Sequence, residues 1–424
     1  MSVALLLGTL LLLIIMGVPI AYALGGATVV YTIVMGIEPS VLVQRAVGSV
    51  DSFPLLAIPL FILAGELMNA GGITRRLVEF VQGWIGFLRG GLAISNVGGS
   101  LVFSGMSGSA VADTGGLGSV FIPAMREQGY TPAFAGAVTA ASATVGPIIP
   151  PSIPLVIYGL LANVSIGGLF LAGVVPGLVL VAFMMVFTVA LSARRNYPRA
   201  DAFQFGLAIR STVGAFWALL MPLVVVGGIL AGVFTATEAA GAAVAYALVV
   251  GTVIYREVSL AKLLSALAIS ARRTAQVSII VAFAGYFAWI ISIERIPPMV
   301  NTWLSGLGLG PIGLALLLVL LLLIIGTFME PLSAMLIFVP VLAPVAQTAG
   351  LDPLHFGIIV VLTLMIGLVT PPVGVCLYMV ADIGEVEVHE VIRDILPFIL
   401  VLVVTVVVLV LVPPLATWLP SVAG

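Results

Sequence analysis

The sequence has few charged residues and almost no cysteine. Only 8% of its 424 residues are charged, whereas a soluble domain carries about 25%. Hydrophobic residues make up 62% of the chain, and no soluble fold could bury that much apolar surface. We therefore expect an all-α polytopic protein that lies in a membrane, in contact with lipid. The single cysteine, Cys376, excludes an intrachain disulfide.

Residues that several functional classes require are also missing. The net charge of -2 and the lack of a basic stripe argue against a nucleic-acid partner. There is no Gly-x4-Gly-Lys-Ser/Thr motif, and Lys262 is the only lysine, so ATP is not expected as an internal energy source. No Ser/His/Asp set and no metal-ligating cluster is visible, since His355 and His389 stand alone in loop-like contexts. We expect neither an enzyme nor a resident cofactor.

The second half of the sequence loosely repeats the first half. At an offset of 221, Gly129, Pro132, Gly136, Gly146, Pro150 and Pro151 have the counterparts Gly350, Pro353, Gly357, Gly367, Pro371 and Pro372. Just before them, residues 113–123 resemble residues 330–340 at an offset of 217. This shift predicts about one added helical turn between Pro340 and Gly350, and it makes Asp113 the counterpart of Glu330. Matched apolar halves interrupted by Gly and Pro are typical of repeat-built transporters.

The repeat divides the chain into two domains. We expect residues 1–205 to form the first repeat and residues 206–424 the second, with the junction near residues 196–206. The first repeat is predicted to hold a re-entrant helical hairpin at about 95–126 and a Pro-broken helix at about 131–163. In the second repeat, the hairpin is predicted at about 312–346 and the broken helix at about 353–383. An odd number of crossings in each half would make the two repeats inverted.

Basic residues indicate the orientation. Two groups are present, Arg194, Arg195, Arg199 and Arg210 near the junction, and Arg256, Lys262, Arg272 and Arg273 further on. Two predicted spans, residues 212–234 and 236–255, separate these groups. Both groups should therefore lie on one face, which the positive-inside rule makes cytoplasmic.

Two polar stretches interrupt the apolar sequence and predict the hairpin tips. One covers residues 103–116 and is rich in Gly and Ser; the other covers residues 326–331. Irregular backbone survives at membrane depth only where it lines a protein cavity. The flanks of the second stretch, residues 314–325 and 333–341, look too short to cross a membrane, which favours a hairpin over two crossings.

The Pro-Pro pairs predict where each broken helix is interrupted. Proline cannot donate a hydrogen bond, so each pair frees carbonyl groups on one side and leaves a half-helix N-terminus on the other. Carbonyl and hydroxyl oxygens suit a small cation, and half-helix N-termini suit a carboxylate. Two tips and two breaks thus predict two cation sites beside one anion site. The alternative for any single position is a packing kink or a small residue at a helix contact.

These motifs resemble those of the large membrane subunit of tripartite ATP-independent periplasmic (TRAP) transporters. The resemblance spans essentially the whole chain and is strongest at residues 57–68, 103–114, 146–152, 234–240 and 367–374. It implies an elevator-type architecture in a bacterial or archaeal inner membrane. It also implies a small membrane subunit and a soluble periplasmic binding protein as partners. The implied activity is Na+-coupled uptake of an organic acid, such as a C4-dicarboxylate, sialic acid or another sugar acid.

The resemblance assigns roles to individual residues as well. It implies one Na+ site at Ser104, Ser107, Ser109, Thr144 and Gly146, and another at Gly326, Thr327, Gly367 and Thr370. The residues expected to face the substrate are Pro150, Pro151, Ser152, Pro371 and Pro372. Asp113 and Glu330 are either coupling acids or structural caps of the hairpins. The rival functions are a stand-alone carboxylate carrier coupled to Na+ or H+ and, with less support, an intramembrane enzyme.

Overall fold

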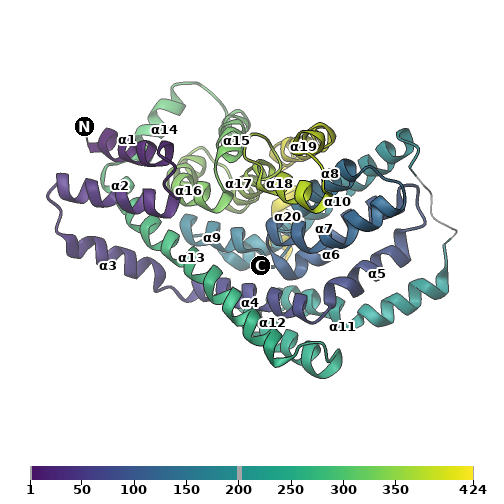
Figure 1. Cartoon of the computed structure of the whole chain (residues 1–424). Coiled ribbons are helices and arrows are strands. Elements are labelled where there is room, and N and C mark those ends of the chain that lie inside the picture. The colour runs from purple at the N-terminus through teal and green to yellow at the C-terminus, as the bar shows by residue number, and fades with distance from the viewer. Residues whose placement is uncertain (1, 198–202, 424) are drawn as a thin grey trace.

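The structure is a computed structural model that describes residues 2–197 and 203–423, and this part of the chain is helical without any β-strand (Figure 1). The helices of the first half are α1 (Ser2–Ile15), α2 (Ile20–Val34), α3 (Pro39–Val50), α4 (Ala57–Ala70), α5 (Ile73–Ile85), α6 (Gly91–Ser107), α7 (Ala110–Glu127), α8 (Pro132–Ala143), α9 (Ile153–Ala162) and α10 (Ile166–Arg194). Those of the second half are α11 (Phe205–Leu230), α12 (Ala236–Val249), α13 (Leu260–Ile293), α14 (Ile296–Ser305), α15 (Pro311–Phe328), α16 (Pro331–Thr348), α17 (Pro353–Gly367), α18 (Val375–Gly384), α19 (Val388–Leu411) and α20 (Pro414–Ala423). The predicted all-α class is confirmed.

Large apolar side chains cover much of the outer surface. Among the described residues, eight helical segments are long and apolar enough to cross a membrane. On α11, for example, Val213 and Leu223 are 70% and 67% exposed. Such a surface would be unfavourable in water but is the surface that lipid requires. The membrane assignment therefore holds for the folded chain as well as for its composition.

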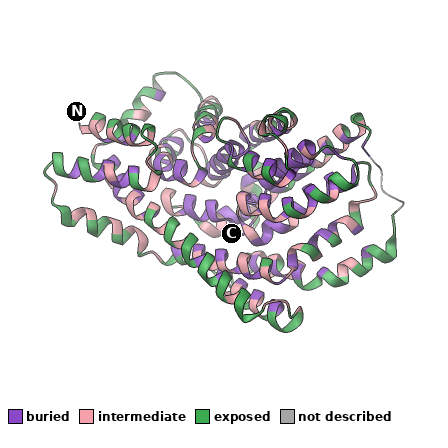
Figure 2. Cartoon of the chain, viewed as in Figure 1, coloured by how far each residue is buried: buried purple, intermediate pink, exposed green. Residues whose placement is uncertain are grey.

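The buried residues concentrate in the middle of the molecule, as Figure 2 shows. The two broken helices form this core: α8 is buried from Ala133 to Ala143, and α17 from His355 to Gly367. The hairpins α6–α7 and α15–α16 pack against α8 and α17. The segments that the sequence marks with Gly and Pro thus lie at the centre, enclosed by the apolar helices.

The two halves repeat at a nearly constant offset of 221 residues. Helices α3, α7 and α8 begin at residues 39, 110 and 132, and α13, α16 and α17 begin at residues 260, 331 and 353. The second hairpin arms α7 and α16 are both 18 residues long. The predicted extra turn between Pro340 and Gly350 is therefore wrong, because chance similarity near the tips suggested a false offset.

Two further expectations about the second half also need correction. Helices α15 and α16 each contain 18 residues, so the flanks of the second tip are not too short to span a membrane. His355 does not lie in a loop, because it is buried in the first turn of α17, where its Nε2 atom lies 2.8 Å from the Leu409 carbonyl. His389 likewise lies in the first turn of α19. Neither histidine position could be read without knowing where these helices begin.

Contacts between helix ends show that the repeats are inverted. Helix α8 begins beside the C-terminal end of α10, where the hydroxyls of Thr131 and Tyr197 are 2.9 Å apart. Helix α17 begins beside the N-terminal end of α10, because a Cβ atom on Gly168 would lie 3.2 Å from Leu354. The two broken helices therefore start at opposite ends of α10 and run in opposite directions.

The C-terminal end of α10 defines one face of the molecule, which we call the arginine end. It carries Arg194 and Arg195, and Arg89 just before α6 donates a hydrogen bond to Asn196 at 3.3 Å. Arg199, which belongs to the predicted basic group, lies outside the described residues. The base of the first hairpin and the start of α8 thus both lie at the arginine end.

The two halves differ in a helix that precedes each hairpin. Helix α13 runs continuously for 34 residues, from Leu260 to Ile293. The equivalent first-half segment is divided into α3 and α4 by residues 51–56, which include a 3₁₀ turn with Pro54. Proline at this point removes a backbone donor and favours the interruption.

An ion pair at the arginine end holds the two halves together. Both terminal guanidinium nitrogens of Arg195, Nη1 and Nη2, donate to the Asp394 carboxylate, at 2.9 and 2.8 Å. Asp394→Asn should lower the free energy of unfolding by about 1 kcal/mol, because it removes the charge from a bidentate pair. Thermal unfolding of the purified protein measures this loss.

The exposed pair Arg75–Glu79 offers a control for this prediction, since its side chains are 76% and 54% exposed. Glu79→Gln should cost at most about 0.3 kcal/mol. Equal effects of the two substitutions would contradict a special role of Arg195 and Asp394.

Candidate functional site

The two hairpin tips and the two helix breaks meet at one small cavity of about 70 Å³. Its lining comes from four separate segments, namely Gly108, Ser109, Ala110, Val111, Pro147, Ile153, Pro154, Glu330, Pro331, Leu332, Met365 and Leu368. The volume admits a few water molecules but is far below the roughly 300 Å³ of a small ligand pocket. The conformation described here is therefore closed around the point where both halves converge.

The first tip lies directly on the first break. Helix α6 ends at Ser107 and α7 begins at Ala110, so Gly108 and Ser109 form the turn. Gly108 has a φ of +57°, and a Cβ atom on it would lie 2.6 Å from the Pro151 carbonyl oxygen. Only glycine suits both this backbone conformation and this close approach.

Asp113 lies between the first tip and the first break. Its side chain is fully buried, and one carboxylate oxygen accepts a hydrogen bond from the Ser107 hydroxyl. The other oxygen has no hydrogen-bond partner in the described chain and faces Gly146, where a Cβ atom would collide with it. Because the C-terminal end of α8 also presents carbonyl groups here, the surroundings of Asp113 are rich in oxygen and negative potential.

The other predicted hydroxyls of the first site bond to nearby backbone. Ser104 donates to Leu101 at 2.6 Å, and Thr144 donates to Ala141 at 2.7 Å. Ser109 accepts from a backbone N–H as the N-cap of α7. A hydroxyl that donates its proton in this way keeps lone pairs for a cation.

Ser152 begins the second half of the first broken helix. Its hydroxyl accepts from Leu155 N–H at 3.2 Å and donates to the carbonyl of Pro147. Ser152 is therefore the N-cap of α9 and closes the turn across the break. Because Ile153 and Pro154 follow it, the N-terminus of α9 reaches the central cavity.

The second tip meets the second break through backbone contacts. Helices α15 and α17 approach so closely at Gly326 and Gly367 that a Cβ atom on Gly367 would collide with the Gly326 carbonyl. Val373 N–H donates to the Thr327 carbonyl at 3.3 Å. The hydroxyls of Thr327 and Thr370 bond within their own helices, at 2.7 and 2.6 Å. The structure thus brings together all four residues predicted for this site.

Asp113 and Glu330 are not counterparts, contrary to the sequence prediction. In the offset that the helices share, Glu330 corresponds to Ser109, and Asp113 corresponds to Ala334. Glu330 is the N-cap of α16 and accepts from Ser333 N–H at 3.0 Å. Asp113 lies one turn inside α7 and caps nothing. Glu330 therefore acts as a hairpin cap, whereas Asp113 is a buried acid without such a role.

The four prolines predicted to face the substrate are not among the residues that line the cavity. Pro150 and Pro151 are buried beside it, and Pro372 is exposed. Their role in substrate binding stays a prediction. Sequence reasoning missed the first residues of α9 and α16, although the N-caps Ser152 and Glu330 could have pointed to them.

Comparison with known proteins identifies the family. The family described as "Tripartite ATP-independent periplasmic transporter, DctM component" matches residues 7–415. The sialic acid TRAP transporter large permease protein SiaM of Vibrio cholerae is 42% identical over 379 residues, 89% of each chain. The 2,3-diketo-L-gulonate TRAP transporter large permease protein YiaN of Escherichia coli is 38% identical over 404 residues, 95% of each chain.

A solved structure shares the fold. The YdaH transporter of Alcanivorax borkumensis, described as having an unusual topology, superposes with a TM-score of 0.63. The match covers 87% of this chain and 86% of that one, at 19% sequence identity. Together with the paired hairpins and broken helices, the family match over residues 7–415 leads to one conclusion: the chain belongs to the family of DctM components, the large permease subunits of TRAP transporters.

Proposed function

We propose that this permease subunit imports an organic acid across a bacterial inner membrane, driven by Na+. As a member of a transporter family, it is a permease component and not an enzyme. Its relatives are named for sialic acid and 2,3-diketo-L-gulonate, both of which carry a carboxylate. In this proposal a small membrane subunit and a periplasmic binding protein complete the system, and the binding protein selects the acid.

One observation carries the proposal: three helix N-termini point at the central cavity. The first residues of α7, α9 and α16 all line it. Helix N-termini carry a partial positive charge, so their convergence suits a carboxylate even though Pro154 and Pro331 have no N–H to donate. Oxygen-rich groups around Asp113 and around Thr370 lie behind the two tips and suit monovalent cations. A carboxylate between two cation sites is the arrangement expected of a cation-coupled acid carrier.

Charge balance supports two or more coupled cations. Moving a dianion inward against about 100 mV costs roughly 4.6 kcal/mol, at about 2.3 kcal/mol per charge. Two Na+ ions would cancel this electrical term, and a third would let the membrane potential drive uptake.

The contacts of the central helices with their neighbours support an elevator-type movement, and the closed cavity requires the tips to open as well. No acid fits into about 70 Å³, so the tips must separate from the breaks to admit one. We propose that the hairpins and broken helices move as one body against the scaffold helices α4 and α11 to α13. Small residues lie at this boundary, where Gly105 packs on Pro222 and Gly65 on the Met106 carbonyl. Such contacts let helix backbones approach closely without interlocking side chains.

The coupling ion can be tested in proteoliposomes that contain the complete complex with its cognate binding protein. An inward Na+ gradient should drive accumulation of the acid, because each acid enters with its cations. Uptake that is equal without Na+, under a proton gradient alone, would sink the sodium proposal.

Substitution of the cation ligands should change the Na+ dependence without unfolding the protein. Ser107→Ala and Thr370→Ala should each raise the Na+ concentration for half-maximal uptake about tenfold, since one ligand is worth roughly 1.4 kcal/mol. Ser119→Ala is the control, because its hydroxyl bonds to Gly116 on an exposed part of α7. Wild-type sodium titrations in both site variants would argue against these ligands.

The close contact between Gly326 and Gly367 behind the second tip should be essential for uptake. Gly367→Ala should abolish uptake while the protein still inserts, because the added methyl group pushes α15 away from α17. Gly313→Ala is the matched control on α15, where the nearest atom, in Leu309, would lie 3.4 Å away. Normal uptake by Gly367→Ala would show that the second tip does not need this contact.

A further inference from the structure

A column of buried polar side chains joins α6 to α8 in the first half. The Asn96 amide donates to the Thr139 hydroxyl at 2.6 Å, and the Ser100 hydroxyl donates to that of Ser142 at 2.8 Å. At most 1% of the surface of each residue is exposed. We call these four residues the polar ladder.

The polar ladder contains an oxygen that the protein leaves without a partner. Thr139 donates its own proton to the Ala135 carbonyl at 2.8 Å, so it must accept from the Asn96 nitrogen. This fixes the Asn96 amide and leaves its Oδ1 atom without a hydrogen bond in the described chain; the Ser95 hydroxyl beside it is also unpartnered. An unpaired buried polar atom lowers the stability of a protein by about 1–3 kcal/mol. Hydrogen bonding within the protein therefore does not explain why these polar residues are present.

Helix packing does not account for it either, because the second half keeps only one of these four polar residues. At an offset of 221, the counterparts of Asn96, Ser100, Thr139 and Ser142 are Leu317, Leu321, Val360 and Thr363. Helix α15 nevertheless packs on α17. A hairpin arm can thus rest on a broken helix with a single polar residue, and the further polar residues of the first half serve another purpose.

The polar ladder leads toward the buried acid of the first site. Ser142 lies one helical turn before Gly146, against which the unpartnered oxygen of Asp113 is placed. In the other direction, Asn96 lies eleven residues before Ser107 on α6. Eleven helical residues cover about 16 Å, roughly half of a 30 Å hydrocarbon core. The ladder therefore extends from the first tip toward the arginine end.

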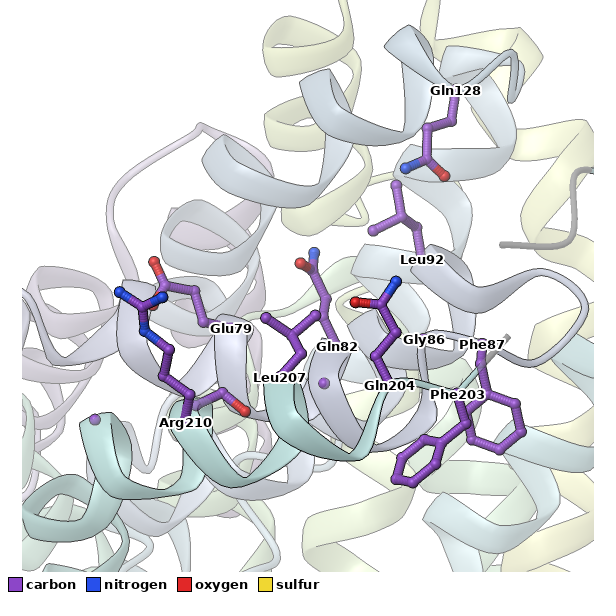
Figure 3. Close-up of a pocket in the computed structure, with 13 residues that line it drawn as sticks. Glu79, Gln82, Gly86, Phe87, Leu92, Gln128, Phe203, Gln204, Leu207 and Arg210 are labelled. Atoms are coloured by element: carbon purple, nitrogen blue, oxygen red, sulfur yellow. The ribbon is translucent and has the colours of Figure 1, made fainter. Parts of the chain in front are cut away.

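A hollow of about 620 Å³ opens at the arginine end, where the polar ladder ends. We call this hollow the vestibule. Figure 3 shows Leu92 and Gln128 at the base of the first hairpin, Gln82 on the facing helix α5, and Gln204 just before α11. Leu92 lies one turn before Asn96 on α6, so the vestibule reaches the first rung of the ladder.

We propose that the vestibule and the polar ladder form a hydrated path by which the cation beside Asp113 exchanges with the arginine end. This inference rests on the proposed cation coupling at the first site. Amide and hydroxyl oxygens about one helical turn apart can replace part of the water shell of a monovalent cation. The leucine and valine that replace Asn96 and Thr139 cannot, so the second site has no equivalent path between α15 and α17. The two sites exchange their cations by different routes.

Silver ion can test the path directly, because it is a monovalent cation of nearly the size of Na+ and binds thiolates tightly. In a Cys376→Ala background, Thr139→Cys and Val360→Cys place one thiol at equivalent, buried positions of the two halves. The complete complex in proteoliposomes is exposed to silver nitrate in chloride-free buffer, and the remaining thiol is labelled with a maleimide after denaturation. The Thr139→Cys thiol should be blocked at least tenfold faster than the Val360→Cys thiol, and Na+ should slow the reaction.

The outcomes separate this inference from the proposed function. Equally slow blocking of both thiols would overturn the path. Fast blocking at Thr139→Cys that choline and Na+ affect equally would support the path but contradict Na+ as the ion that uses it.

A second variant keeps the inference falsifiable through transport. Asn96→Leu combined with Thr139→Val copies the second half and removes both partners of a hydrogen bond, so the melting temperature should not fall. The maximal uptake rate should drop about tenfold at an unchanged Na+ concentration for half-maximal uptake. An unchanged uptake rate would show that the polar ladder carries no cation.

Discussion

Each helix break leaves backbone carbonyl and amide groups without helical partners at a depth where a membrane offers no water. The second tip meets this constraint where Val373 N–H bonds to the Thr327 carbonyl, and the first tip packs the Gly108 backbone against the Pro151 carbonyl. A tip and its break therefore depend on each other, and neither could face lipid alone. The surrounding apolar helices enclose these four irregular segments and keep them away from the hydrocarbon.

The same backbone holds different chemistry in its two halves. At equivalent N-caps, Ser109 offers a neutral hydroxyl and Glu330 a carboxylate at the edge of the cavity. One turn further, Asp113 is a buried acid where the other half has Ala334. The first half thus has its acid, Asp113, behind the hairpin tip, whereas the second half has its acid, Glu330, at the tip itself. Under the proposed cation coupling, the two sites would in this way differ in affinity and in access.

The repeated Gly and Pro pattern was enough to predict the hairpins and broken helices, because those residues act on the local backbone. The alignment of the two halves at their hairpin tips could not be predicted in the same way. Helix ends are set by caps such as Ser109 and Glu330, and these two look unlike each other in sequence. The pairing of Asn96 with Thr139 was also invisible, since it joins residues 43 positions apart through tertiary packing. Composition could not show which residues would line the cavity.

The long helix α13 and its divided counterpart α3–α4 make the two halves mechanically unequal. A continuous helix of 34 residues is a rod of about 51 Å, and bending it would break backbone hydrogen bonds along its length. The segment with Pro54 already lacks such bonds at its joint, so it can change angle at little cost. If the central hairpins and broken helices slide, α13 would thus stay straight on one side, and the joint between α3 and α4 would bend on the other.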